Sequence, residues 1–179
     1  MNICVYGAAS DTIHENYISA AYELGSTMAQ KGHTLVFGGG ATGIMGACAR
    51  GIVAEGGKLI GVAPRFFDEP GILYKGCTEF IFTETMRERK QTMEDLADAF
   101  IVSPGGIGTY EEFVEILTLK QLGRHNKPIV MLNTMGYYEP MEALMKNTVD
   151  KGFMKKECLD LFVVIDNPES AVAFIESVL

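Results

Sequence analysis

Residues 100–113, with the sequence FIVSPGGIGTYEEF, join a short run of large apolar residues to three glycines and then to a helical pattern. An apolar run that ends in glycines just before a helix is typical of a buried parallel strand followed by a tight turn. Residues 35–46, LVFGGGATGIMG, repeat this arrangement earlier in the chain. Two such units predict an α/β fold with parallel strands.

Short apolar runs alternate with longer helical patterns along the rest of the chain. We expect strands at 3–6, 35–37, 59–63, 77–82, 100–102, 129–132 and 162–165. Helices are expected at about 14–31, 43–55, 85–97, 110–122 and 138–151, and from residue 168 onward. We therefore predict a doubly wound, Rossmann-like parallel sheet in a three-layer α/β fold, with 1–179 as one nucleotide-binding domain. Ligands of such folds bind beyond the carboxyl ends of the strands, and the irregular segment 64–76 is a candidate to cover that site.

Composition and charge limit the classes of partner that the protein can have. The chain has 179 residues, of which 47% are hydrophobic and 21% charged, as expected for a globular protein rather than a disordered one. The chain contains 15 Lys and Arg residues and 23 Asp and Glu residues, which gives a formal charge of -8. No basic stripe is present, so nucleic-acid polymers and anionic membranes are excluded as partners, whereas small anions are not. The apolar runs are too short to cross a membrane, and no signal peptide is recognised, so we expect a cytoplasmic protein.

Cysteine and histidine are sparse. The four cysteines and three histidines lie far apart in the sequence, without a C-x-x-C pair, so we predict no metal site and no cofactor. Cys4 and Cys48 have apolar or small neighbours, and we expect both to be buried free thiols.

The first glycine loop, residues 38–46, contains the pattern G-x-G-x-x-G. Glycines let the backbone turn tightly, and the N-terminus of the following helix can bind an anion. Two interpretations remain open: a turn needed only for packing, or a contact to phosphate or ribose through Gly40 and Gly43. A dinucleotide site also needs an acid at the end of the next strand, where this chain has Pro64 and Arg65, so a nicotinamide oxidoreductase is disfavoured.

The second glycine loop, residues 104–112, again follows a strand and precedes a helix. It predicts a second anion-binding turn. Thr109 and Glu112 have the spacing of a capping box, with Thr109 as the N-cap. A functional carboxylate remains compatible with that cap, because Glu112 shares its helical face with Ile116 and Leu119 and is directed toward a semi-buried region.

Residues 85–90, TMRERK, supply a third feature. Thr85 and Glu88 form another predicted capping box. The core-facing stripe of this helix is predicted to contain Met86, Lys90, Met93 and Ala97. Arg89 lies on the same side, and two buried cations are costly unless a negative charge meets them. Either they reach the surface or a structural carboxylate, or they bind a phosphate or carboxylate of a substrate.

Together these residues resemble the Lonely Guy family of cytokinin riboside 5'-monophosphate phosphoribohydrolases, long mislabelled as lysine decarboxylases. The family signature P-G-G-x-G-T-x-x-E matches residues 104–112, and its R-K pair matches Arg89 and Lys90. Further similarity at 38–46, 60–64, 121–123 and 136–138 extends the resemblance over nearly the whole chain.

The resemblance implies a hydrolase that cleaves the N-glycosidic bond of a purine nucleoside 5'-monophosphate and releases the free base and ribose 5-phosphate. It implies Arg89 and Glu112 as the catalytic pair. The implied substrate contacts, with the glycine loop on the 5'-phosphate, are Lys90, Gly105, Gly106, Ile107, Gly108, Thr109, Tyr110, Glu111 and Thr118. We add Gly40, Gly43 and Met86 as candidates. The family also implies a homodimer with the site near the interface, and residues 107–122 and 138–150 are candidate contacts.

Two positions depart from the family pattern. Arg87 stands where members commonly have His, and Gly71, with Glu69 nearby, stands where plant members have a substrate-binding Glu. These departures concern recognition of the base rather than chemistry at the ribose. The alternative function is a non-catalytic carrier of a nucleotide or phosphorylated cofactor, since related folds bind phosphorylated pterins. Such a carrier needs the loop but not the carboxylate. A pyridoxal lysine decarboxylase is excluded, because it needs a Schiff-base lysine in a large fold of its own.

Overall fold

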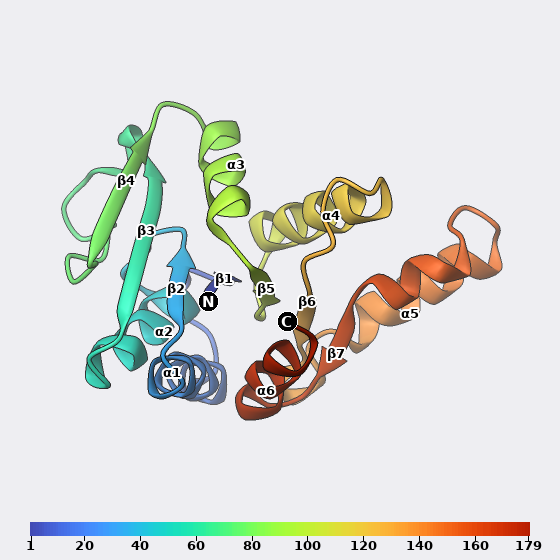
Figure 1. Ribbon diagram of the computed structural model, residues 1–179, viewed down its shortest axis with the longest axis horizontal. Coiled ribbons are helices and arrows are strands. Elements are labelled where there is room, and N and C mark those ends of the chain that lie inside the picture. Colours follow the sequence, from blue (N-terminus) through green and yellow to red (C-terminus); the bar gives the residue numbers. More distant parts are fainter.

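Seven parallel strands form one sheet in the order β4-β3-β2-β1-β5-β6-β7 (Figure 1). The computed structural model describes residues 1–179. The strands are β1 (Asn2–Tyr6), β2 (Thr34–Phe37), β3 (Lys58–Pro64), β4 (Glu79–Thr83), β5 (Ala99–Val102), β6 (Ile129–Leu132) and β7 (Val163–Ile165). Each predicted strand is present, with ends that shift by at most two residues, and the predicted doubly wound parallel sheet is confirmed.

Helices cover both faces of the sheet. They are α1 (Glu15–Gln30), α2 (Gly43–Ala54), α3 (Met86–Leu96), α4 (Ile107–Gln121), α5 (Glu139–Asp150) and α6 (Pro168–Val178). Figure 1 shows α1, α2 and α6 on one side of the strands and α3 and α4 on the other. Three short 3-10 helices lie at Arg65–Phe67, Thr134–Gly136 and Lys156–Leu161. None of these helices combines the length and hydropathy that crossing a bilayer would require.

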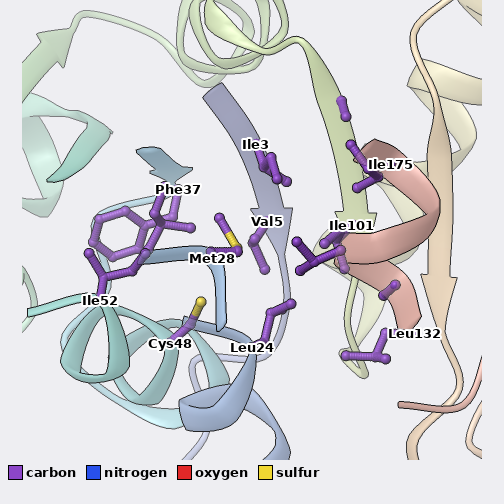
Figure 2. Packing of buried hydrophobic residues seen from close by; sticks show 14 of the residues in the cluster. Ile3, Val5, Leu24, Met28, Phe37, Cys48, Ile52, Ile101, Leu132 and Ile175 are labelled. Carbon is purple, nitrogen blue, oxygen red and sulfur yellow. The ribbon is translucent and has the colours of Figure 1, made fainter. Parts of the chain in front are cut away.

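The core lies on both faces of β1 because successive side chains of a strand point to opposite sides. Ile3 and Val5 pack against α1, α2 and α6 (Figure 2), and Cys4 and Tyr6 pack against α3 and α4. Cys4 and Cys48 are buried free thiols, as predicted.

The strand order reverses at β1, which pairs with β2 on one side and β5 on the other. Loops that leave neighbouring strands at such a reversal run to opposite faces and open a crevice between them. Both glycine loops begin at this crevice, because one follows β2 and the other follows β5.

The start of α4 differs from the prediction. The helix begins at Ile107 rather than at residue 110, and its N-cap is Gly106, which has no side chain to cap it. The prediction of Thr109 as N-cap was therefore wrong: Thr109 already lies inside the first turn, and its buried side chain occupies the space beside Gly105. The capping box of Thr85 and Glu88 at the start of α3 is confirmed.

Candidate active site

A cavity of about 580 Å³ opens where β1, β2 and β5 end. Its walls come from the loops after these strands, from α3 and from the first turns of α4. The segment after β3 covers it as expected, through Phe67, Gly71, Ile72 and Leu73. No cluster of three His, Cys, Asp or Glu in the chain is close enough to hold a metal ion.

A buried ion pair forms one wall of this cavity. Arg89 of α3 donates from Nη1 to Oε1 of Glu112 in α4 over 2.7 Å, and the two side chains are only 8% and 10% exposed. Arg89 also donates from Nε to the carbonyl of Val62 at 3.2 Å. Each charge supplies the partner that the other needs when it leaves water. The cation predicted on the core-facing side of α3 therefore meets a carboxylate at the cavity.

Gly38 makes room for the guanidinium. A Cβ built on Gly38 would lie 2.0 Å from Nη2 of Arg89, far inside contact distance. The glycine at the end of β2 thus allows Arg89 to reach Glu112 across the crevice.

Burial raises the pKa of the Glu112 carboxyl, while the charge and hydrogen bond of Arg89 act in the opposite direction. The carboxylate is more basic than one in water. Oε1 of Glu112 is engaged by Arg89, and Oε2 accepts no hydrogen bond from the chain. One oxygen of a basic carboxylate is therefore available to a ligand in the cavity.

The second glycine loop presents free backbone donors beside this pair. The N–H groups of Ile107, Gly108 and Thr109 form the first turn of α4 and donate to no other group of the chain. A helix N-terminus with unpaired N–H groups attracts anions through hydrogen bonds and through the helix dipole. The structure thus supports the predicted anion-binding turn.

The first glycine loop differs, because its donors are already used. At the start of α2, the N–H of Gly43 donates to Oδ1 of Asp11 at 2.9 Å. The N–H groups of Ile44 and Met45 donate to the carbonyl of Ala8 at 2.9 and 3.3 Å. Of the two open interpretations, the structure favours the packing turn over a phosphate contact. Asp11 was missed by sequence reasoning, since no local pattern connects it to a helix that begins 32 residues later.

The first glycine loop also anchors the segment that covers the cavity. Ala41 donates its N–H to the carbonyl of Ile72 at 2.9 Å, and Tyr74 donates its N–H to the carbonyl of Gly39 at 2.8 Å. These bonds hold the side chains of Ile72 and Leu73 at the cavity. Sequence reasoning identified the covering segment but not these residues, because the pairing joins parts of the chain about 30 residues apart.

The predicted site residues fall into two groups. Those that line the cavity are Gly40, Met86, Arg89, Gly106, Gly108, Thr109 and Glu112. Those outside its lining are Gly43, Lys90, Gly105, Ile107, Tyr110, Glu111 and Thr118. Of the two positions that depart from the family pattern, Gly71 lines the cavity and Arg87 is exposed.

Lys90 bonds to carboxylates on the outer side of α4. Its Nζ lies 2.6 Å from Oε1 of Glu111 and 2.7 Å from Oε2 of Glu115. Burial lowers the pKa of Lys90, but the hydrogen bonds to the two carboxylates outweigh burial and raise it above the ordinary lysine value. Thr118 is exposed on the same helix.

Known proteins resemble this chain in sequence and in fold. A family profile described as "Possible lysine decarboxylase" matches residues 45–175. A Mycobacterium tuberculosis protein named cytokinin riboside 5'-monophosphate phosphoribohydrolase is 41% identical over 170 residues, which cover 95% of this chain and 90% of that protein. A relative of the same name in Arabidopsis thaliana is 35% identical over 98% of this chain and 77% of its own length. Among solved structures, the Moco carrier protein from Chlamydomonas reinhardtii has a TM-score of 0.74 and 26% identity, over 98% of this chain and 95% of that one. Since the profile covers most of the sequence and the curated relatives align almost end to end, the chain belongs to the Lonely Guy family, which was first described as lysine decarboxylase-like.

Proposed function

We propose that the protein hydrolyses the N-glycosidic bond of a purine nucleoside 5'-monophosphate, such as a cytokinin riboside 5'-monophosphate or AMP, to the free base and ribose 5-phosphate. The observation that carries this proposal is the buried pair of Arg89 and Glu112 in a cavity wall next to the free N–H groups of α4. The names of the curated relatives support the same reaction.

The 5'-phosphate binds at the N-terminus of α4 in this proposal. The backbone N–H groups of the first turn supply donors without a side-chain cation, and the cavity reaches Gly106, Gly108 and Thr109. Binding energy from the phosphate, which does not react, fixes the ribose near Glu112 and contributes to catalysis.

Glu112 carries the chemistry at C1' of the ribose. Cleavage passes through an oxocarbenium-like state, which a neighbouring carboxylate stabilises. The free Oε2 accepts a proton from water while the water oxygen bonds to C1' and the bond from C1' to the purine nitrogen breaks. The departing purine nitrogen takes up a proton from solvent, and Glu112 returns the proton from the attacking water to solvent, so no net proton is gained or lost. Arg89 orients Glu112 and the nucleotide, because a guanidinium holds its protons too firmly to act as an acid.

The base lies against the apolar part of the cavity in this arrangement. Met45, Phe67, Ile72, Leu73 and Met86 offer an apolar surface of the kind that purine rings bind. No acidic side chain stands at position 71, where plant members have one, so contacts to the base come mainly from apolar surface.

Turnover is tested by incubating the purified protein with AMP and with isopentenyladenosine monophosphate, and by measuring free base and ribose 5-phosphate. Glu112→Gln retains an oxygen for Arg89 but cannot take up the proton. We expect it to abolish turnover while nucleotide binding survives. A wild-type protein that binds nucleotides and never releases base would instead be a carrier, the alternative to which the structural likeness to a Moco carrier protein points.

We further propose that two copies pair through the outer faces of α4 and α5. No residue of α5 is fully buried, and Figure 1 shows this helix extending away from the sheet. Large apolar side chains are exposed on these helices, at Val114 of α4 and Leu144 of α5, and just beyond their C-terminal ends, at Leu122 and Phe153. Pairing would cover them and bring Thr118 of α4 close to a second copy. Light scattering should give twice 19.5 kDa for the wild type and the single mass for Leu144→Asp.

A further inference from the structure

The peptide bond between Gly105 and Gly106 has a fixed orientation. The carbonyl of Gly105 accepts a hydrogen bond of 2.6 Å from the hydroxyl of Tyr137 and accepts from no other group of the chain. In a trans peptide the carbonyl and the N–H point in opposite directions. The N–H of Gly106 is therefore directed away from Tyr137, and it has no partner within the chain.

Nothing in the two glycines themselves fixes this orientation. A peptide flip changes ψ of Gly105 and φ of Gly106 by about 180°, and glycine tolerates both signs of φ at little cost. A larger residue cannot replace Gly105, because its Cβ would overlap the side chain of Thr109. The loop therefore needs flexible residues and depends on a contact from outside to hold one orientation.

Tyr137 is well placed to supply that contact. It follows a tight turn in which Met135 and Gly136 both have positive φ, of 56° and 72°. The hydroxyls of Tyr110 and Tyr137 lie 3.0 Å apart. Each hydroxyl has one proton, and Tyr137 gives its proton to Gly105, so Tyr110 must be the donor in this pair. The bonds then run in one direction, from Tyr110 through Tyr137 to Gly105, and each strengthens the next.

Tyr137 lies on the side of the second glycine loop that faces away from the large cavity. Tyr137 lines a small cavity of about 180 Å³, with Tyr17 and Pro104, and not the large cavity that contains Glu112. Burial raises the pKa of Tyr137 to about 12, so its hydroxyl keeps its proton at neutral pH.

We infer that Tyr137 is a positioning residue, whose hydroxyl holds the Gly105–Gly106 peptide so that the N–H of Gly106 faces the 5'-phosphate. This inference rests on the proposed function, since it assumes a phosphate at the second glycine loop. It assigns a role in phosphate recognition to a side chain that touches no substrate.

The test compares Tyr137→Phe with wild type on a substrate with the phosphate and one without it. The phenyl ring retains its packing against Tyr17 and Tyr138. We expect KM for AMP and the dissociation constant of ribose 5-phosphate to rise together by about three- to tenfold, the effect of losing one hydrogen bond. The kcat/KM for adenosine should stay unchanged. The matched control is Tyr17→Phe, which removes a hydroxyl that makes no hydrogen bond in the same cluster.

A second variant tests the flip itself. Gly106 has φ of -93°, and a Cβ there would meet nothing within 4 Å, so Ala fits the present orientation but not the flipped one with positive φ. In a Gly106→Ala background, Tyr137→Phe should therefore weaken ribose 5-phosphate binding by a smaller factor. Equal factors in both backgrounds, or equal losses for AMP and adenosine, would overturn the inference. Ribose 5-phosphate binding by calorimetry needs no turnover, so failure of the proposed reaction remains distinguishable from failure of this role.

Discussion

Replacing Gly38 by Ala should disable the ion pair of the cavity without removing either charge. The added Cβ would lie 2.0 Å from Nη2 and 3.1 Å from Cζ of Arg89, whereas ordinary contacts begin near 3.4 Å. Nη2 must move by about 1.4 Å, and because the guanidinium is rigid and planar, Nη1 and its bond to Glu112 are displaced with it. Misplacing a catalytic group by about 1 Å costs on the order of 100-fold in rate, so kcat/KM should fall by about that factor.

The fold should survive this substitution. Gly38 does not have a positive φ, and the nearest atom to its added Cβ belongs to the end of a long side chain that can move. The assay is the initial rate of base release from AMP, combined with urea unfolding of the same preparations. Gly32→Ala is the control: φ there is +75° and nothing lies within 4 Å of the added Cβ. It should lose about 1 kcal/mol of stability and keep its rate.

A Gly38→Ala enzyme with kcat/KM within threefold of wild type would contradict this expectation. Such a result would mean either that Arg89 has a second productive position or that its bond to Glu112 does not contribute to turnover. Equal losses of rate in Gly38→Ala and Gly32→Ala would also refute it, because the effect would then follow stability rather than geometry.

Three further outcomes are expected. The acidic limb of the pH profile of kcat/KM should lie above 4.5, the ordinary glutamate pKa, because burial raises the pKa of Glu112 and turnover needs its ionised form; a limb at or below 4.5 argues against Glu112 as the base. Thr85→Ala should lower the free energy of unfolding in urea by about 1 kcal/mol through loss of the cap on α3, and an unchanged value would contradict that role. Asp11→Ala should lower the free energy of unfolding in urea by about 1–3 kcal/mol, because its carboxylate accepts the N–H of Gly43. It should leave KM for AMP within twofold. A large rise in KM would indicate a phosphate contact at the first glycine loop.

The sheet could be predicted from the sequence because its signals are local. Each strand is a short run of apolar residues, and a strand buried on both faces needs no partner from elsewhere to be recognised. The glycines at 38–40 and 105–106 mark where two of these strands end. General rules for α/β folds placed the candidate site beyond the carboxyl ends of the strands. The strand order, and with it the reversal at β1, was not predicted, because it depends on which strands pair across the sheet.

The start of α4 shows where local patterns fail. The spacing of Thr109 and Glu112 fits a capping box, and the same spacing also occurs inside a helix whose cap is a glycine. The local spacing cannot distinguish these two arrangements. In the structure, the carboxylate of Glu112 does not cap the helix but accepts a hydrogen bond of 2.7 Å from Arg89, which belongs to another helix. The functional interpretation of Glu112 could be reached from the sequence, but its geometry depends on a contact that spans 23 residues.

The two glycine loops show why a phosphate site cannot be recognised from glycines alone. Both follow a parallel strand, both precede a helix, and both present the N-terminal N–H groups of that helix toward the crevice. At α2 these groups bond to Asp11 and Ala8, and at α4 they have no partner. A helix N-terminus binds an anion only if its donors are free, so the difference lies in a carboxylate far away in the sequence. Whether the N–H groups at the start of the helix are already bonded, as at α2, or free, as at α4, therefore identifies the candidate anion site better than the glycine spacing does. The first loop anchors the segment that covers the cavity, while the N–H groups at the second loop remain free.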